Sequence, residues 1–330
     1  MINYLIRRLG TTLITVLVLS YTIFAIVQIP PGDAVDRQVR LRQTQGDVVT
    51  REEIETLRAQ YGLDRPILVR YYQWIRGFLV GDLGRSTSGR RVNDLIAERL
   101  PQTVALAVAG LIITYAIGIP VGIYSATHQY SAGDYIANSI SFIGMSVPGF
   151  LIGIILLYLF YKWFGLSIGG FFSVEYKSAP WSWARLQDLI NHLWVPLFVV
   201  AVGSTGGLIR TMRATLLDEL SKQYVMTARA KGVPMRKLLL KYPVRLALNP
   251  IIASIGHIFP YLLSGQVVIA IVLNLPVLGP LLNTALTNED IALSSSILLI
   301  QSLLAVFGTV VSDVLLAVLD PRIRFERGAH

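Results

Sequence analysis

The chain has 330 residues, of which 53% are hydrophobic and only 15% charged, and it carries a formal net charge of +9. Soluble domains have about a quarter charged residues, so this composition excludes an ordinary soluble domain and predicts a membrane protein. The lack of cysteine in the sequence excludes disulfides and thiolate metal sites.

The N-terminal end of the chain predicts a retained signal anchor. Arg7 and Arg8 precede an uncharged apolar run over 9–29, which is long enough to cross a bilayer. The run is longer than the apolar core of a cleaved signal peptide, and no small-residue cleavage site follows it. We therefore expect residues 1–29 to form the first transmembrane helix.

Residues 30–98 are expected to form a partly helical extracytoplasmic segment. Thr50 and Glu53 have the spacing of a capping box that begins one helix. A second helix is expected over 65–79, because apolar and aromatic residues recur there on one face. This stripe predicts packing against the membrane mouth or a small core, and a docking surface for a soluble partner is the alternative. The stripe consists of Ile67, Tyr71, Trp74, Ile75 and Phe78.

Five further transmembrane helices are expected within residues 99–320, followed by a cytoplasmic tail over 321–330. The predicted fold class is therefore an all-α membrane protein with six transmembrane helices. Pro148, Pro250 and Pro260 are expected to kink or interrupt spans. The spans are expected within the apolar stretches 100–133, 135–161, 189–209, 246–272 and 291–318.

The distribution of basic residues predicts that both ends of the chain are cytoplasmic. With the N-terminus inside, the short inner segments hold 14 Lys/Arg and the short outer loops hold 3. The 12 Lys/Arg of the long segment 30–99 are set aside, because the positive-inside rule weakens for loops beyond about 60 residues.

The loop 210–245 between the fourth and fifth spans is basic and amphipathic. A short helix is expected to end at Gly232, and Pro234 is expected to open a second one. A surface helix on anionic lipid explains the basic pattern, and nucleic-acid binding is a weaker interpretation, since topology alone predicts a basic loop here. Neither explains the small residues Thr227, Ala228 and Ala230. They favour a helix that fits into a protein cleft.

Residues 226–232, M-T-A-R-A-K-G, resemble the E-A-A-x-x-x-G signature of type I ATP-binding-cassette importer permeases. Met226 and Thr227 replace the first Glu and Ala of that signature, which leaves one polar contact to the ATPase in question. The form Y-V-x-T-A-R-A-K-G is similar to the dipeptide/oligopeptide/nickel permease family, and the resemblance covers nearly the whole chain. Further matches are Y-L-I-R-R-L (4–9), P-G-D (31–33), Y-G-L-D-R-P (61–66), G-D-L-G-R-S (81–86), E-R-L-P-Q-T (98–103) and L-D-P-R-I-R (319–324).

The resemblance implies that residues from about 221 to 242 form a coupling helix. In this family the segment inserts into a groove of a separate cytoplasmic ATPase and transmits nucleotide-driven closure to the spans. The resemblance implies that small side chains at Ala228 and Ala230 permit close approach and that Gly232 permits a sharp exit. The implied coupling residues are Met226, Thr227, Ala228, Arg229, Ala230, Lys231, Gly232 and Val233.

The resemblance also implies a set of partners in a bacterial or archaeal cytoplasmic (inner) membrane. They are a homologous permease subunit in a heterodimer, two ATPase subunits or domains, and an extracytoplasmic solute-binding protein for which residues 30–98 are a candidate contact. The chain has no G-x-x-x-x-G-K-[ST] motif, so ATP and Mg²⁺ are expected only on the partners and no enzyme activity is expected here. Peptide is the expected cargo, with oligosaccharides or metal chelates as alternatives.

A self-contained secondary transporter is the rival class of function, and a membrane scaffold is a third. Ion-coupled carriers usually bury ionisable relay residues in their spans. Here His257 and Asp313 are candidates, and a helix–helix hydrogen bond or a structural pairing explains them equally well. The four histidines of the sequence show no metal-ligand spacing, so no metal site is expected.

Overall fold

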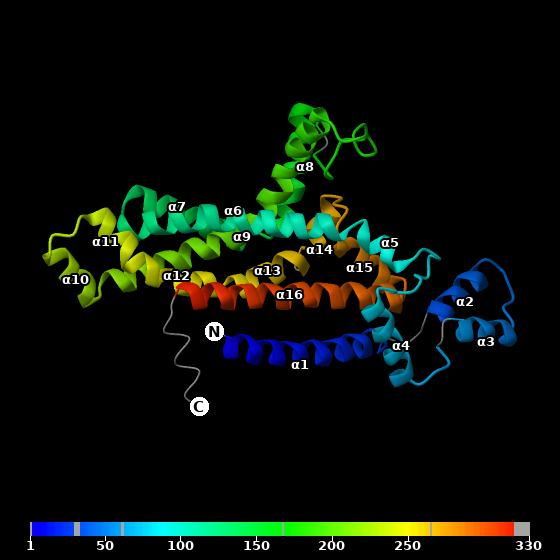
Figure 1. Cartoon of the computed structure of the whole chain (residues 1–330). Helices are drawn as coiled ribbons and strands as arrows, with labels where there is room; N and C mark the ends of the chain where they lie inside the picture. Colours follow the sequence, from blue (N-terminus) through cyan, green and yellow to red (C-terminus); the bar gives the residue numbers. More distant parts are fainter. Residues whose placement is uncertain (1, 30–33, 61–62, 167, 265, 320–330) are drawn as a thin grey trace. The chain divides into compact units, whose positions relative to one another are not determined.

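All regular secondary structure in the described residues is helical. The structure is a computed structural model that describes residues 2–29, 34–60, 63–166, 168–264 and 266–319, so the expected tail lies outside the described residues (Figure 1). The helices are α1 (Ile2–Val27), α2 (Ala34–Thr44), α3 (Arg51–Gln60), α4 (Ile67–Val80), α5 (Val92–Ala97), α6 (Leu100–Thr127), α7 (Ala132–Ser146), α8 (Gly149–Phe164), α9 (Trp183–Leu220), α10 (Gln223–Ala230), α11 (Met235–Lys241), α12 (Pro243–Ala253), α13 (Ile255–Ser264), α14 (Val267–Val272), α15 (Leu278–Thr287) and α16 (Ile291–Leu319).

Five helical stretches of the described chain are long and apolar enough to cross a membrane, and a bent pair raises the number to six. The five are α1, α5 with α6, α9, α11 to α14, and α16. The sixth requires α7 and α8 to count as one broken span. The expected all-α membrane fold is confirmed on this basis.

The third span is interrupted within the stretch expected over 135–161. It is divided into α7 and α8, which are bent by 98° at the break. Val147 at the break is extended, with ψ of 123°, because the ring of a following proline disfavours helical backbone. Pro148 also lacks the N–H that a continuous helix needs. The interruption expected at Pro148 is confirmed, and the third span is a bent pair of helices.

The fifth span is likewise interrupted near its prolines. Pro250 lies inside α12, which ends at Ala253, and Pro260 lies inside α13, which ends at Ser264. At the first break the Ser254 hydroxyl lies 2.6 Å from the Tyr115 hydroxyl of α6. Proline has no backbone N–H, so one helical hydrogen bond is already missing at each of these positions. A break in the helix near the proline therefore costs less free energy than a break elsewhere. The interruption expected near Pro250 is confirmed by the break at Ser254, and the residue that follows Ser264 lies outside the described residues.

The chain divides into two compact units, each described here by itself. Unit 1 comprises residues 1–103 and 277–304, and unit 2 comprises residues 104–276 and 305–330. The continuous helices α6 and α16 each contribute residues to both.

In unit 1 the aromatic stripe of α4 packs against the first span. The Tyr71 hydroxyl lies 2.7 Å from the Ser20 hydroxyl, and the rings of Phe24 and Trp74 stack at 5.2 Å between centroids. Trp74 Nε1 also donates to Ser296 Oγ of α16 at 3.4 Å. The stripe therefore packs against α1 and α16, and its place relative to the membrane mouth stays a prediction.

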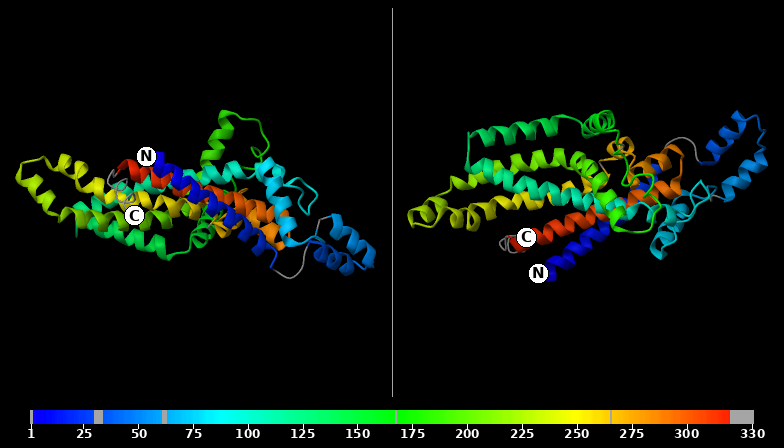
Figure 2. Two further views of the ribbon diagram at one scale, coloured as in Figure 1. Left: turned by 60° about the horizontal axis from the view of Figure 1, so that its bottom comes forward. Right: turned by 90° about the horizontal axis from the view of Figure 1, so that it is seen from above.

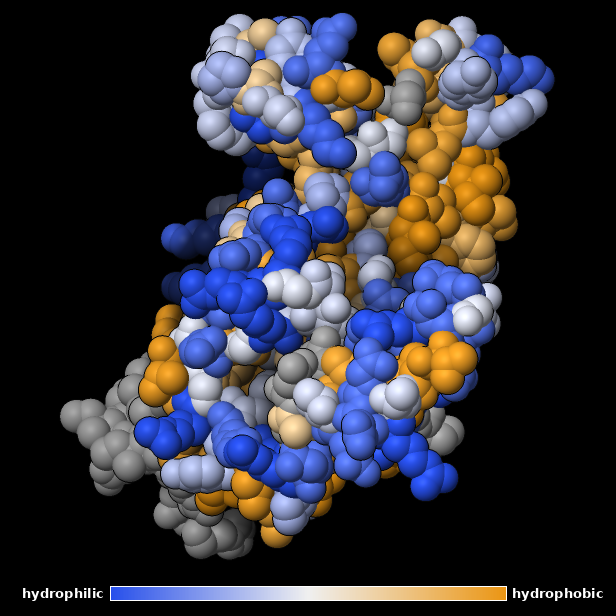
Figure 3. All heavy atoms as spheres, turned by 90° about the vertical axis from the view of Figure 1, so that its right-hand side faces the viewer, coloured by the Kyte–Doolittle hydropathy of each residue, from blue (hydrophilic) through white to orange (hydrophobic). Residues whose placement is uncertain are grey.

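Unit 1 also contains a polar helical pair, α2 and α3. The Glu53 N–H donates to Thr50 Oγ1 at 3.3 Å, so the predicted start of this helix is confirmed. An ion pair of 2.7 Å joins Arg58 to Asp36 across the two helices. Their surface is mostly hydrophilic (Figure 3). A separate apolar cluster joins α5 to α15 and α16, with Val92, Ile96, Leu278, Leu282, Ala285, Leu293 and Ile297 buried in it.

Unit 2 is built around α9, which packs against α7, α8, α12 and α14 (Figures 1 and 2). Glycines let the helices approach closely, as is usual between membrane helices. A Cβ at Gly206 of α9 would lie 2.7 Å from the Ser141 carbonyl oxygen of α7, and one at Gly122 of α6 would lie 2.6 Å from Met212 Cβ. The close packing of α9 therefore depends on residues without side chains.

Two adjacent glycines of α9 provide a matched test of this packing. Gly206→Ala is expected to lower the free energy of unfolding by about 1 to 3 kcal/mol, because the new methyl group collides with backbone and forces the helices apart. Gly207→Ala should leave stability unchanged or raise it by about 0.5 to 1 kcal/mol, since a Cβ there meets nothing within 4 Å and alanine favours helix. Thermal unfolding of the two purified variants in one detergent checks the contrast, and equal losses would contradict it.

Candidate functional site

The residues of the implied coupling segment form a helical hairpin at one end of unit 2 (Figures 1 and 2). The chain leaves α9 at Leu220, forms α10, turns at Lys231 to Pro234 and forms α11 before entering α12. Pro234 is the N-cap of α11, one position earlier than a first-turn proline, with φ of −53° and ψ of 136°. α10, α11 and the turn between them are called the tip below.

The turn of the tip is a Schellman motif. Gly232 has φ of +72°, a left-handed conformation that glycine adopts without a Cβ clash. Its N–H donates to the Arg229 carbonyl at 3.0 Å, and the Val233 N–H donates to the Ala228 carbonyl at 3.3 Å. These two bonds satisfy carbonyls that the end of α10 leaves without helical partners. The predicted stop at Gly232 is confirmed.

A small apolar core holds α10 against α11. Val225, Ala228 and Leu238 are buried in it, with 1%, 8% and 0% of their surfaces exposed. Tyr224, Val233 and Tyr242 cover this core. The small side chain of Ala228 therefore packs inside the tip, whereas the small side chain of Ala230 is exposed. This differs from the expectation that the two alanines act alike at a surface.

The outer surface of the tip is formed by the other members of the predicted set. Met226 is 64% exposed, and Thr227, Arg229, Ala230 and Lys231 are also exposed. Helical periodicity puts these side chains on the side of α10 that does not meet α11. They form a short surface in which Ala230 contributes only a methyl group, and Arg229 and Lys231 give its end a positive charge.

The tip is joined to the end of α9 by a hydrogen bond. The Tyr224 hydroxyl donates to the Glu219 carboxylate. Burial raises the pKa of the Tyr224 hydroxyl, and the hydrogen bond to Glu219 raises this pKa further. The protonated Tyr224 hydroxyl thus joins α10 to the end of α9.

A buried ion pair in the spans next to the tip was not predicted. Asp134, 2% exposed at the start of α7, accepts from Arg213 Nε and Nη2, each at 2.8 Å. Asp134 also accepts from the Tyr130 N–H at 2.9 Å, from Asn138 Nδ2 at 2.6 Å and from the Ser125 hydroxyl. A buried carboxylate is stable only with such a full set of donors.

This ion pair positions the end of α9. Ser125 belongs to α6, Tyr130 to the following turn, Asn138 to α7 and Arg213 to α9, so one carboxylate joins four segments. Arg213 lies about 10 Å along the helix from Leu220, where α9 gives way to the tip. The ion pair therefore holds in place the end of α9 from which the tip extends.

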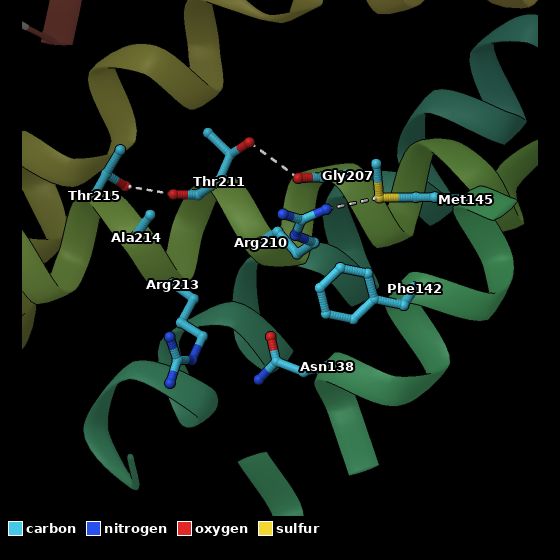
Figure 4. Close-up of a pocket in the computed structure, with 9 residues that line it drawn as sticks. All are labelled: Asn138, Phe142, Met145, Gly207, Arg210, Thr211, Arg213, Ala214 and Thr215. Carbon is cyan, nitrogen blue, oxygen red and sulfur yellow. Dashed lines mark hydrogen bonds between the residues drawn. The ribbon is translucent and has the colours of Figure 1, made fainter. Parts of the chain in front are cut away.

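Two grooves with polar residues in their walls lie beside α9 in unit 2. The first has a volume of about 650 Å³ and runs between α7 and α9 (Figure 4). The second has a volume of about 570 Å³ and reaches α13. Met145, Gly207 and Thr211 line both grooves. His257, which the sequence left open between a path and a helix contact, is exposed in the second groove. Within the described ranges, no group of three or more His, Asp or Glu residues could hold a metal ion.

Comparison with known proteins places the whole chain in one family. Residues 118–325 match the family described as the binding-protein-dependent transport system inner membrane component, and residues 1–107 match the N-terminal part of such membrane components. A putative peptide permease protein of Brucella ovis is 33% identical over 329 residues, covering 98% of this chain and 99% of the relative.

Two other relatives match over similar lengths. The oligopeptide transport system permease protein AppB of Bacillus subtilis is 34% identical over 328 residues, with 98% of this chain and 100% of the relative covered. A probable peptide ABC transporter permease protein of Sinorhizobium fredii is 30% identical over 326 residues, with 98% and 99% covered. The chain is thus a transporter subunit and not an enzyme. It is a multi-pass protein that belongs to the family of inner-membrane components of binding-protein-dependent transport systems.

Proposed function

We propose that the chain is one of two permease subunits of an ATP-driven peptide importer. The observation that carries this proposal is the match of the chain along its whole length to permeases named for peptide or oligopeptide transport. A second, homologous permease completes the translocation path. An extracytoplasmic binding protein delivers the cargo, and residues 30–98 are its candidate contact.

The ATP and Mg²⁺ that drive transport bind to partner subunits. The chain itself lacks a P-loop motif. The exposed outer surface of the tip, with Met226, Thr227, Arg229 and Ala230, is the part of unit 2 best suited to enter a groove of an ATPase, because it is narrow and ends in a rigid glycine turn. The hydrogen bond of Tyr224 and the ion pair of Arg213 then transmit displacement of the tip to α9.

In this arrangement the tip and both chain ends face the cytoplasm. The short segments on that side carry most of the Lys and Arg residues outside residues 30–99, as the positive-inside rule requires. Residues 30–98 follow the first span and therefore lie on the opposite side, where the binding protein is found.

Site-directed cysteine crosslinking tests this proposal sharply, because the natural sequence contains no cysteine. Ala230→Cys places one thiol on the exposed surface of the tip, and Ala228→Cys places one inside its core. In the assembled transporter with its partner subunits, a short bifunctional crosslinker is expected to join the Ala230→Cys variant to the ATPase subunit. The Ala228→Cys variant should give at least about tenfold less product, since a buried thiol reacts slowly.

The isolated permease provides the control. A water-soluble maleimide should label Ala230→Cys quickly in the isolated permease and slowly after assembly with the ATPase subunits. Equal labelling rates in the two states, with no crosslink, would leave the tip free in water and overturn the coupling role.

A further inference from the structure

The groove between α7 and α9 holds an arginine that has no charged partner. The Arg210 guanidinium carbon lies 4.4 Å from the centroid of the Phe142 ring, and Nη1 lies 3.9 Å from Met145 Sδ (Figure 4). In the part of the chain that the structure describes, Arg210 forms no ion pair. Arg213, one turn further along α9, is by contrast held by Asp134. Arg210 is thus a cation held beside Phe142, with N–H donors beyond the one that contacts Met145.

The floor of the groove beside Arg210 is open and rich in acceptors. A Cβ at Gly207 would meet nothing within 4 Å. The Thr211 hydroxyl donates to the Gly207 carbonyl at 2.9 Å, and the Thr215 hydroxyl donates to the Thr211 carbonyl at 3.0 Å. Because both hydroxyl protons are engaged with the helix backbone, their oxygen lone pairs remain as acceptors for N–H groups of a ligand.

The groove continues into the second groove along the same face of α9. The two share Met145, Gly207 and Thr211, and the second adds Ser204, His257 and Tyr261. A span that faces lipid presents apolar residues, whereas polar side chains along a span face protein or a water-filled path. A site for a lipid headgroup would end at the membrane surface, but the two grooves together extend along α9 from Gly203 to Thr215.

Resting on the proposed function, we propose that these grooves are this subunit's part of the translocation path and that Arg210 binds the terminal carboxylate of the peptide cargo. A guanidinium offers two parallel N–H donors that match the two oxygens of a carboxylate. Stacking on Phe142 holds its plane, so little freedom is lost when the carboxylate arrives. The oxygens of Thr211 and Thr215 accept from the peptide backbone alongside.

The test uses the complete transporter in liposomes, with its partner permease, ATPases and binding protein. Uptake is measured for one peptide as the free acid and as the C-terminal amide, so that selectivity of the binding protein affects wild type and variant equally. Arg210→Gln is expected to lower uptake of the free acid about tenfold and to leave uptake of the amide unchanged, because it removes a charge-assisted hydrogen bond. Arg210→Lys should retain part of the preference. Lys177→Gln, which removes an exposed charge of the same unit outside the grooves, should behave as wild type.

Three results would overturn the inference. One is an equal fall in uptake of both peptides, and another is no fall at all. The third is a fall that depends on the anionic lipid content of the liposomes and not on the peptide carboxylate, which would assign Arg210 to a lipid headgroup. ATP hydrolysis stimulated by the loaded binding protein reports whether each complex is intact. If the wild-type complex itself takes up neither peptide with ATP, the proposed function fails instead.

A second variant keeps the inference testable if Arg210→Gln does not assemble. Gly207→Leu puts a large side chain into open space, so the fold should tolerate it while the groove is filled. Uptake of both peptides is expected to fall at least about tenfold in a complex that remains assembled. Normal uptake by this variant would show that cargo does not pass along this face of α9.

Discussion

Gly232→Pro is expected to abolish ATP-dependent uptake while the permease remains inserted in the membrane. Gly232 has φ of +72°, whereas the proline ring fixes φ near −65°, so the turn between α10 and α11 cannot form. Proline also removes the N–H that bonds the Arg229 carbonyl. The tip would then present its outer surface in the wrong direction. Uptake and ATP hydrolysis measured on the same reconstituted complex check the result, and hydrolysis should lose its stimulation by the loaded binding protein.

Gly232→Ala is the graded control for this prediction. Nothing lies within 4 Å of a Cβ at this position, so the only cost is that of a left-handed alanine, about 1 kcal/mol. This variant should keep the N–H donor and retain reduced but measurable uptake. If both variants transported as well as wild type, the geometry of the tip would have no part in coupling.

Asp134→Ala is expected to lower the free energy of unfolding of the chain by about 3 kcal/mol, because it leaves a buried charge without its partner. The substitution leaves Arg213, whose side chain is only 21% exposed, without its carboxylate. It also removes the acceptor of the Tyr130 N–H and of Asn138 Nδ2. The end of α9 should loosen, so coupled ATP hydrolysis should fall with stability.

A double-mutant cycle separates the interaction energy of Asp134 and Arg213 from the contributions of the other residues around them. Asp134→Leu combined with Arg213→Met replaces both charges by apolar groups and should recover most of the stability, because no buried charge is then unpaired. Thermal unfolding of the wild type, the two single variants and the double variant gives the coupling energy, expected to be at least about 2 kcal/mol. Strictly additive losses would show that the two side chains do not depend on each other.

The sequence could predict features whose partners lie within a few residues. Thr50 and Glu53 predicted the start of α3, and the hydrogen bond between them lies where the capping pattern requires it. Gly232 predicted the end of α10, and its left-handed φ follows from the same local rule. The spans followed from apolar length alone, and Pro148 predicted the interruption of the third one. The size of the bend could not be predicted, because the stretch around Pro148 is apolar on both sides of it.

The ion pair of Asp134 and Arg213 could not be predicted in this way. The two residues are 79 positions apart, and only the packing of α7 against α9 brings them together. Within its own neighbourhood Asp134 takes part in the start of α7, where its N–H donates to Ser131 Oγ. The burial of Ala228 could not be predicted for a similar reason. The periodicity of the sequence does not tell which side of α10 contacts α11.

The helix α9 is long and continuous, whereas the chain from α12 to α14 beside it is divided into shorter helices. Its 38 residues extend for about 57 Å, whereas the hydrocarbon layer is about 30 Å thick. The neighbouring chain is divided among three shorter helices, α12, α13 and α14. We therefore expect a displacement of α10 to move α9 as a rigid body, while the shorter helices α12 to α14 shift relative to it. Such a movement would change the width of the second groove without unfolding either side of it.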